Sequence, residues 1–503
     1  MSEFRQRGLI AARMLCVMEL TDAACYAAFL SHDRKFDGRF FIGVASTGVY
    51  CRPVCSVRTP KPENCSYYPS AAAAERQGFR PCLKCRPELA PGLAPVDAGG
   101  RYAKVAARLI ESGFLADHNC PQLAARLGIT DRHLRRIFAE QFGASPIEYA
   151  QSQRLLNAKR LLMDTDLPLL QVAHEAGFSS LRRFNEMFCD RYRLSPSEIR
   201  QRQQAGSALP ASLQFRLAYR PPYDWDWMMN FMASRAMKGL ETVEAGSYVR
   251  SLTIMQGGKA HPGWVRVTPE PTQSRVVVEV SAGLSPVVPE VLAQMRQLFD
   301  LDAEPQDIAE VLGELALPRP GLRLPGAVGG FEFAVRAVLE QQVSVKAAAT
   351  LAGRLIERCG EVIETPFAGV CRLFPSAEAV AALPVEVLRE IGLSRQRAHC
   401  LHTLASQQAQ GLLRLDFVVD VEAAITRLTE LPGIGIWTAT YIAMRAWGWP
   451  DAFLATDLII RQRFAGYKPI DIERHAERWR PWRSYAVLHL WQGTPIRLTE
   501  PGL

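Results

Sequence analysis

The sequence predicts a multidomain α+β protein. With 503 residues the chain is too long for one ordinary hydrophobic core, so several domains are expected. Its composition, with 48% hydrophobic and 22% charged residues, is typical of a folded protein and not of a disordered one. Two segments with the composition of linkers, 88–100 and 203–212, separate stretches whose hydrophobic periodicity differs.

These stretches indicate four structural units. Residues 39–50 have the pattern of a strand and a turn and lead into a Cys-rich loop, whereas 101–202 carry apolar residues at helical spacing. Alternation over 275–281 and a helical pattern over 288–301 indicate a mixed unit, and from Phe331 the chain is again mainly helical. We therefore expect a small α/β domain (19–90), an all-α domain (101–202), an α+β domain (213–320) and a second all-α domain (321–493).

The distribution of charge favours a nucleic-acid partner for the first two units. The net charge is +8; residues 1–207 carry 29 Lys and Arg against 20 Asp and Glu, and the remainder carries 30 against 31. A local basic excess is the electrostatic footprint of nucleic-acid binding, although a merely soluble basic surface would look the same.

No apolar run is long enough to span a bilayer and no secretory signal is evident, so we expect no membrane partner and a cytoplasmic location. Met18 is a plausible second start besides Met1.

Two close cysteine pairs predict a zinc site. Cys51 and Cys55 are separated by three residues, Cys82 and Cys85 by two, and 26 residues lie between the pairs. Four thiolates from two such pairs can reach one tetrahedral Zn²⁺. The spacing alone favours a closed structural site.

The residues around these cysteines widen that interpretation. FFIGVASTGVYCRPVCSVR and GFRPCLKCRPE resemble the N-terminal domain of the Ada-type alkylation-response regulators. The resemblance implies that one Zn²⁺ binds all four cysteines and that Cys51 accepts a methyl group from a methylphosphotriester in DNA. It also implies that Thr47, Arg58 and Arg80 contact the DNA backbone. Methylating one thiolate changes the formal charge of a zinc site with four thiolates from −2 to −1, so we expect the transfer to strengthen DNA binding.

Residues 101–202 contain a pattern that occurs twice. Segments 120–149 and 167–199 each combine a short helical stretch, a glycine turn at Gly128 or Gly177, and a helix with an arginine pair. This is the pattern of a helix-turn-helix, and the pair resembles the AraC-type DNA-binding domain. An ordinary helical bundle with solvated arginines is the alternative. The candidates for base or phosphate contacts, not distinguished at this point, are Arg132, His133, Arg136, Arg182 and Arg183.

The C-terminal unit contains a glycine turn followed at a distance by an aspartate. In Leu431–Gly435 (LPGIG), Gly433 and Gly435 would let backbone N–H groups approach a DNA phosphate between two helices. Asp457 lies 22 residues beyond Gly435 in apolar surroundings. By itself such an aspartate is best interpreted as a helix N-cap.

The wider context resembles the helix-hairpin-helix DNA glycosylases, and within them the AlkA-type 3-methyladenine enzymes, over residues 213–493. Matching segments include PPYDWDWMMNF, RPGLRLPG and RWRPWRSYAVLHLW. The resemblance implies that Asp457 stabilises the cationic sugar formed when an alkylated base leaves. It places Phe231, Trp437, Tyr441 and Trp491 in the aromatic base pocket, whereas core packing is preferred for Trp225 and Trp227.

Several absences and departures narrow this expectation. Relatives that cleave the strand carry a Lys at the position of Trp437, so a monofunctional enzyme that leaves an abasic site is expected. No cysteine follows Cys400, so no iron–sulfur cluster is expected, and the Pro-Cys-His-Arg motif for reversal of O6-methylguanine is missing. Gln342 occupies the wedge position that is usually Leu, and Leu458 follows Asp457 where an aromatic residue is common. Both departures bear on substrate range.

The sequence thus predicts a DNA alkylation repair and response protein. Its first half would sense methylphosphotriesters and bind promoter DNA, with RNA polymerase as a candidate partner, and its second half would excise bases from alkylated double-stranded DNA. In the main alternative, the first half is only a DNA-docking module without a transcriptional role. In another, the glycosylase half is a degenerate scaffold, against which the intact hairpin and Asp457 argue.

Overall fold

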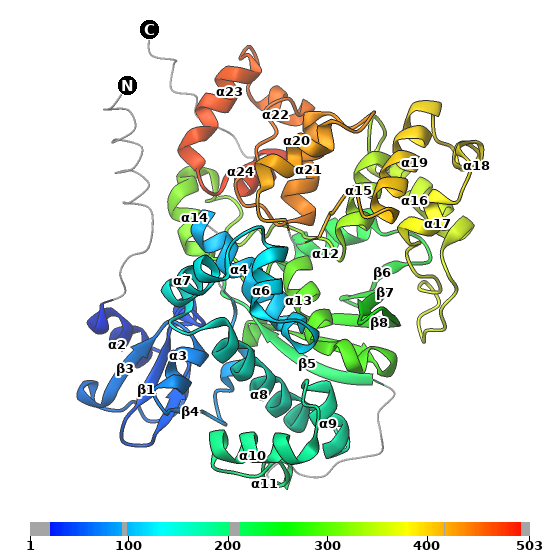
Figure 1. Ribbon diagram of the computed structural model, residues 1–503. Coiled ribbons are helices and arrows are strands. Elements are labelled where there is room, and N and C mark those ends of the chain that lie inside the picture. Colours follow the sequence, from blue (N-terminus) through cyan, green and yellow to red (C-terminus); the bar gives the residue numbers. More distant parts are fainter. Residues whose placement is uncertain (1–20, 93–97, 202–211, 417, 494–503) are drawn as a thin grey trace.

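The structure of the chain is a computed structural model, and it describes residues 21–92, 98–201, 212–416 and 418–493. Figure 1 shows a small N-terminal lobe, a block of helices beside it, a twisted sheet, and a large helical region that contains the C-terminal third of the chain. The multidomain α+β class predicted from the sequence is confirmed. Both alternative starts, Met1 and Met18, and most of the predicted linker 203–212 lie outside the described residues.

The N-terminal lobe is built on a four-stranded sheet with the order β3-β1-β2-β4. β1 (Phe41–Val44) and β2 (Val49–Cys51) form an antiparallel hairpin because Gly48, at φ +63°, adopts the left-handed conformation that the tight turn requires. β4 (Arg80–Pro81) pairs in parallel with β2, which brings the second cysteine pair beside the first. The other elements are α2 (Asp22–Leu30), η1 (Arg34–Phe36), η2 (Pro62–Asn64), β3 (Cys65–Tyr68), α3 (Ala71–Arg76) and η3 (Pro87–Leu89).

The helical block consists of two helix-turn-helix units joined by the long helix α8 (Pro146–Asp164). Gly128 (φ +71°) and Gly177 (φ +83°) form the tight turns, and Thr130 and Ser180 cap the helices that follow them. The two units therefore repeat the same backbone design. The remaining helices are α4 (Ala98–Glu111), α5 (Phe114–Asp117), α6 (Cys120–Arg126), α7 (Asp131–Phe142), α9 (Leu169–Glu175), α10 (Leu181–Tyr192) and α11 (Pro196–Gln201).

The third unit is an antiparallel five-stranded sheet with the order β5-β9-β8-β7-β6. β9 (Arg275–Ser281) alternates as predicted, with Val276, Val278 and Val280 fully buried. The predicted helix over 288–301 is α13 (Val288–Leu298). The other elements are β5 (Ser212–Ala218), α12 (Trp225–Arg235), β6 (Glu241–Glu244), β7 (Ser247–Gln256), β8 (Lys259–Glu270), η4 (Pro271–Gln273), η5 (Ala282–Val287), α14 (Pro305–Leu312) and η6 (Gly313–Leu315).

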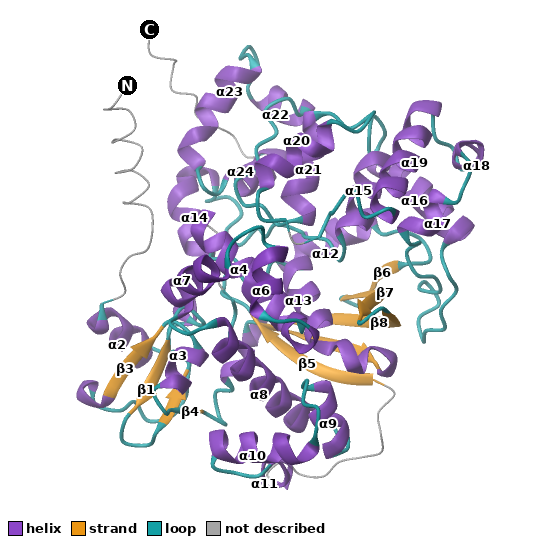
Figure 2. Ribbon diagram, in the orientation of Figure 1, coloured by secondary structure: helices purple, strands orange, loops and turns teal. Residues whose placement is uncertain are grey.

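The fourth unit is helical, and in Figure 2 its helices lie above and to the right of the five-stranded sheet. None of the helices in the described part of the chain is long and apolar enough to cross a membrane. The elements are α15 (Gly330–Leu339), α16 (Val345–Cys359), α17 (Ala377–Ala381), α18 (Val385–Glu390), α19 (Arg395–Ala409), α20 (Val421–Thr429), α21 (Ile436–Ala446), α22 (Leu458–Arg463), α23 (Pro469–Ala476), η7 (Glu477–Trp479) and α24 (Arg483–Trp491).

The units pack tightly against one another. One continuous set of buried apolar side chains runs from the second half of α8 through the five-stranded sheet into the C-terminal helices. The beginning of the predicted linker 88–100 is also held in place, since the Gly92 N–H donates to Asp302 (2.7 Å) and Arg296 donates to the Ala90 carbonyl (3.0 Å). This segment packs because backbone and side-chain groups of the third unit satisfy its polar atoms, which its composition does not reveal.

Candidate functional site

The four predicted cysteines come together at one end of the N-terminal sheet. Their sulfur atoms all lie within 4.8 Å of one another; Cys51, Cys55 and Cys82 are buried and Cys85 is half-buried. Sulfur atoms about 3.8 Å apart are what a tetrahedral zinc–thiolate site requires, given Zn–S bonds of about 2.3 Å. The donor set and its compactness therefore fit one Zn²⁺, as predicted.

The side chain of Arg52 holds the two cysteine pairs together, a role that the sequence analysis missed. Its guanidinium donates to the Cys85 carbonyl (3.0 Å) and to the Asp37 carboxylate (2.8 Å), and its backbone N–H donates to the Cys85 sulfur (3.4 Å). Burial would lower the pKa of Arg52, but the Asp37 carboxylate outweighs burial and raises it. An N–H donated to a sulfur favours the thiolate.

The predicted backbone-contact residues of this lobe are placed differently from one another. Thr47 is exposed in the β1–β2 turn, and Arg80 is half-buried on β4, where its N–H donates to the Gly48 carbonyl (2.9 Å). Thr47 and Arg80 therefore lie close together at the β1–β2 turn, and Arg80 precedes Cys82 by two residues. Arg58 is exposed in the loop after Cys55, and no contact joins it to the other two.

The predicted arginines of the helical block lie on the second helix of each unit. Arg132 and Arg136 are exposed on α7, and Arg182 and Arg183 are exposed on α10. Arg136 pairs with Glu140 at 2.8 Å, and its guanidinium also lies 3.2 Å from His133. Arg182 pairs in the same way with Glu186 at 2.9 Å. Exposed ion pairs of this kind contribute only about 0–1 kcal/mol, so phosphates can displace them easily.

Asp457 has the contacts of a helix N-cap and also contacts with two of the aromatic residues predicted for the base pocket. It is the N-cap of α22, with its Oδ1 accepting from the backbone N–H groups of Ile459 (3.0 Å) and Ile460 (3.2 Å). The same carboxylate also accepts the indole N–H of Trp491 on Oδ1 (3.0 Å) and that of Trp437 on Oδ2 (3.2 Å). Four donors therefore fix one half-buried carboxylate, and three of them are on Oδ1.

The aromatic side chains predicted for the base pocket form a cluster with one outlier. The Trp437 and Tyr441 rings lie 5.0 Å apart and Tyr441 and Trp491 6.1 Å apart, beside Asp457. Phe231 comes from α12 and is covered by the guanidinium groups of Arg235 (3.9 Å) and Arg445 (4.9 Å). Trp225 and Trp227 are both 7% exposed and pack in the core, as preferred from the sequence.

Arg445 connects Phe231 to this cluster, and the sequence analysis did not identify it. It is 1% exposed and donates to the Tyr441 hydroxyl (3.0 Å), and its guanidinium lies 4.9 Å from the centres of the Phe231 and Phe333 rings. A buried cation over aromatic rings is favourable once desolvated. The signal was present, because Arg445 is the single charged residue in the sequence of α21.

The hairpin glycines adopt two conformations. Gly433, at φ +90°, is left-handed, and a Cβ there would lie 2.9 Å from Cys400 Cβ. Gly435 is extended and exposed, and no atom lies within 4 Å of the place of a Cβ. It precedes an 11-residue helix whose first N–H groups have no side-chain cap. These groups are free to bind a phosphate, as helix N-termini do.

Gln342 projects from a short loop that other residues hold in place. It is exposed and left-handed at φ +55°. Gln341 donates to the Gly433 carbonyl (2.9 Å) and Arg397 donates to the carbonyls of Leu339 and Gln341 (3.1 Å each). The loop that carries Gln341 and Gln342 is therefore tied to the hairpin. Leu458, the other departure from the family pattern, is 70% exposed.

A buried histidine near this cluster predicts a pH-dependent stability. His489 on α24 is 3% exposed, and burial followed by repulsion from Arg319 lowers its pKa to about 4, from 6.5. As the pH falls, the unfolded chain therefore binds this proton first. Stability is complete above about pH 6.5 and declines down to about pH 4, by up to about 3 kcal/mol.

Urea unfolding at pH 7.5 and pH 5 measures this loss. The His489→Gln variant should lose less stability between the two pH values than the wild type, while a change at the exposed His399 (His399→Gln) should leave the difference unaltered. Equal pH dependence in His489→Gln and the wild type would contradict the assignment.

Comparison with known proteins covers all four units. Residues 24–88 match the metal binding domain of Ada, 123–202 a helix-turn-helix domain, 214–329 the AlkA N-terminal domain, and 335–481 the HhH-GPD superfamily of base excision DNA repair proteins. The family resemblances inferred from the sequence are confirmed.

Three curated relatives illustrate the arrangement. DNA-3-methyladenine glycosylase 2 of Escherichia coli is 44% identical over 277 residues, which cover 55% of this chain and 96% of that protein. The bifunctional transcriptional activator/DNA repair enzyme AdaA of Bacillus subtilis is 30% identical over 178 residues, covering 35% and 81%. The probable bifunctional transcriptional activator/DNA repair enzyme AlkA of Mycobacterium tuberculosis is 38% identical over 485 residues, covering 93% of this chain and 95% of that protein. With this match over nearly its whole length, the chain belongs to the family of the bifunctional transcriptional activator/DNA repair enzyme AlkA.

Proposed function

We propose that this chain removes alkylated bases from DNA with its C-terminal half and senses DNA methylation damage with its N-terminal half. The observation that carries the glycosylase assignment is the Asp457 carboxylate, fixed by four donors within an aromatic cluster and accompanied by a helix-hairpin-helix turn. The reaction is hydrolysis of the N-glycosidic bond of a 3-methyladenine type of lesion. It leaves an abasic site and free base.

The proposed mechanism begins with extrusion of the damaged nucleotide. The N–H groups at Gly435 hold a backbone phosphate, and Gln342 fills the gap left in the duplex. The cationic base stacks against the electron-rich faces of Trp437, Tyr441 and Trp491. Phe231 is covered by two guanidinium groups. It therefore contributes to the pocket indirectly, by packing against Arg445, which donates to the Tyr441 hydroxyl.

Asp457 then stabilises the positive charge that develops on the sugar. Its Oδ1 already accepts three hydrogen bonds, whereas Oδ2 accepts one. We therefore assign Oδ2 as the oxygen that faces the sugar cation and orients the attacking water. Since Trp437 stands where a Schiff-base lysine would be needed, the reaction does not continue to strand cleavage.

In the N-terminal half, Cys51 is the proposed methyl acceptor. Its sulfur attacks the methyl carbon of a methylphosphotriester; the S–C bond forms, the C–O bond breaks, and the phosphodiester leaves as an anion. Bound Zn²⁺ supplies the low pKa that keeps the thiolate available at neutral pH. Thr47 and Arg80, which lie together at the β1–β2 turn, orient the DNA backbone, with Arg58 as an additional contact.

The two helix-turn-helix units supply the remaining DNA contacts. We assign α7 and α10 to the major groove, with Arg132, Arg136, Arg182 and Arg183 as base or phosphate contacts. A regulator would recruit RNA polymerase at a specific site, whereas a docking module would bind without sequence preference. A footprint upstream of the chain's own gene, seen only after methylation, favours the regulator; uniform protection along the DNA favours docking.

One experiment tests both activities. The full-length, zinc-loaded protein is incubated with methylated duplex DNA, and free bases and protein-bound methyl groups are counted separately. Released 3-methyladenine together with a methyl group on Cys51 supports the proposal. Absence of free bases overturns the glycosylase assignment, and absence of protein-bound methyl overturns the acceptor assignment.

A further inference from the structure

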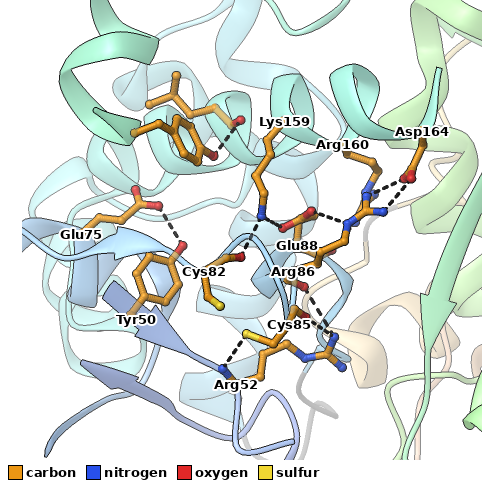
Figure 3. Close-up of polar contacts among 12 residues, drawn as sticks. Tyr50, Arg52, Glu75, Cys82, Cys85, Arg86, Glu88, Lys159, Arg160 and Asp164 are labelled. Atoms are coloured by element: carbon orange, nitrogen blue, oxygen red, sulfur yellow. Dashed lines mark hydrogen bonds and ion pairs between the residues drawn. The ribbon is translucent and has the colours of Figure 1, made fainter. Parts of the chain in front are cut away.

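A buried lysine of the helical block, the proposed DNA-binding block (98–201), donates to the backbone of the cysteine site. Lys159 lies on α8, its side chain is 0% exposed, and its Nζ donates to the Cys82 carbonyl at 3.1 Å (Figure 3). The same Nζ pairs with Glu88 at 2.7 Å. Burial alone would raise the pKa of Glu88, but the Lys159 and Arg86 cations bring it down to about 2. A fully buried lysine is rare unless it is paired, so this contact is a specific one.

The second cysteine pair is anchored to the same helix by a neighbouring arginine. Arg86 follows Cys85 directly and adopts a left-handed backbone at φ +53°. Its guanidinium binds both oxygens of Asp164, at the end of α8, at 2.7 Å each, and its Nε binds Glu88 at 2.9 Å. Asp164 and Glu88 are each 2% exposed at the side chain. Bidentate geometry of this kind fixes position as well as charge.

The first cysteine pair has its own connection. Tyr50 precedes Cys51 on β2, and its hydroxyl donates to Glu75 at 2.9 Å. The other oxygen of Glu75 accepts from Ser152 on α8 and from Arg191 on α10, the latter at 2.7 Å. Glu75 is 5% exposed. The second cysteine pair is therefore joined to α8 through Glu88 and Asp164, and the first pair is joined to α8 and α10 through Glu75.

These polar contacts fix the position of α8 relative to the cysteine loop more specifically than apolar packing alone would. Displacing α8 from the cysteine loop would leave Lys159 as a buried charge without its partners and would separate Asp164 from Arg86, and breaking a buried ion pair typically costs about 3–5 kcal/mol. The partners of the α8 side chains lie on the metal-ligand loop itself: they are the carbonyl of Cys82, Arg86 directly after Cys85, and Glu88. A change in the conformation of that loop therefore alters the buried contacts of α8.

We propose that the DNA-binding block completes the zinc site, with Lys159 as a positioning residue that holds the second cysteine pair, and that the state of the site is in turn transmitted to α8 and α10. This inference depends on the zinc occupancy proposed above. Because coupling between two sites is reciprocal, weakening the α8 contact loosens zinc, and removing zinc loosens the helices. The effect on metal affinity follows the behaviour of groups that orient ligands without touching the metal.

Zinc release from the full-length protein to a chromophoric chelator tests the first direction. Lys159→Met should release zinc about 10- to 100-fold faster than the wild type, since the loss of such outer contacts typically weakens metal affinity by this factor and weaker binding is expressed mainly as faster release. The matched control is Lys35→Met, an exposed lysine of the same lobe, which should release zinc at the wild-type rate. Circular dichroism of the full-length variants reports that each is folded, and base excision, which uses neither residue, reports that the C-terminal half is intact.

A milder pair of variants covers the case in which Lys159→Met fails to fold. Asp164→Asn keeps the size of the side chain and removes the charge that faces Arg86 at 2.7 Å and Arg216 at 4.0 Å, while Asp166→Asn changes an exposed carboxylate two residues away. Faster release in Asp164→Asn alone supports the proposal. Equal release in both variants of this pair and in folded Lys159→Met overturns it.

Hydrogen exchange tests the opposite direction. Stripping zinc from the wild type should reduce amide protection in α8 and α10 while α20 and α21 keep theirs. Unchanged protection in α8 and α10 overturns the transmission to the helices. The zinc content of the wild-type protein, measured first, distinguishes the two proposals: a protein that takes up no zinc defeats the metal site itself, whereas one that holds zinc but behaves identically in all variants defeats only this inference.

Discussion

Replacing Asp457 by Asn should reduce base excision by at least about 100-fold in single-turnover experiments, because removing one preorganised electrostatic contact typically has an effect of this size or larger. The substitution keeps the shape of the side chain and an oxygen that can accept from Ile459 and Ile460, so α22 should still be capped. What it removes is the negative charge beside the sugar. Release of 3-methyladenine from methylated duplex DNA is the measurement.

The control for this experiment is another capping aspartate. Asp420 caps α20 by accepting from the Ala423 N–H at 2.9 Å, but it is exposed and has no aromatic neighbours that donate to it. Asp420→Asn should leave excision within about twofold of the wild type, as surface changes usually do. If Asp457→Asn binds methylated DNA as the wild type does and still releases bases at the wild-type rate, Asp457 is a structural cap and not the catalytic carboxylate.

Cys51→Ser should abolish methyl transfer to the protein and leave base excision unchanged. A hydroxyl is a much poorer nucleophile at neutral pH than a thiolate. The substitution also removes one of the four sulfur atoms that lie within 4.8 Å of one another. Mass spectrometry of the protein after exposure to methylated DNA locates the methyl group. Zinc content should also fall, because three thiolates remain.

A second cysteine of the same lobe provides the comparison. Cys65 is half-buried on β3 and lies outside the group of four, so Cys65→Ser should accept methyl groups at the wild-type level. Methyl groups found on Cys55, Cys82 or Cys85 of the wild type, with Cys51 unmodified, would assign the acceptor role to a different sulfur.

Much of the architecture could be predicted because its determinants are local. The cysteine spacing is short-range, the two helix-turn-helix units each carry their own glycine and cap, and the alternation of β9 is visible in seven residues. Asp457 is an instructive case, because the local sequence predicts a helix cap and the family resemblance predicts a catalytic carboxylate. The structure shows that the two assignments are compatible, since one carboxylate oxygen does most of the capping.

What could not be predicted depends on groups that are distant in the sequence. Lys159 lies in a helix whose pattern gives no reason to bury it, and it is buried because another domain covers it. The indole donors to Asp457 come from residues 20 and 34 positions away on separate helices. Arg445 could have been suspected as a charge in an apolar helix, but its three aromatic neighbours could not be named. Tertiary packing decides these contacts, and periodicity carries no information about them.

The unbroken apolar interior that extends from α8 into the C-terminal helices has a consequence for how the protein melts. Chains with several domains commonly unfold in separate steps, each with its own heat-absorption peak. Here α8 packs against β5 and α4 against α13, so complete unfolding of either half exposes apolar surface of the other. The sensor's second helix-turn-helix unit and the repair enzyme should therefore lose structure as one cooperative unit in calorimetry, and severing the chain between them should cost both pieces stability.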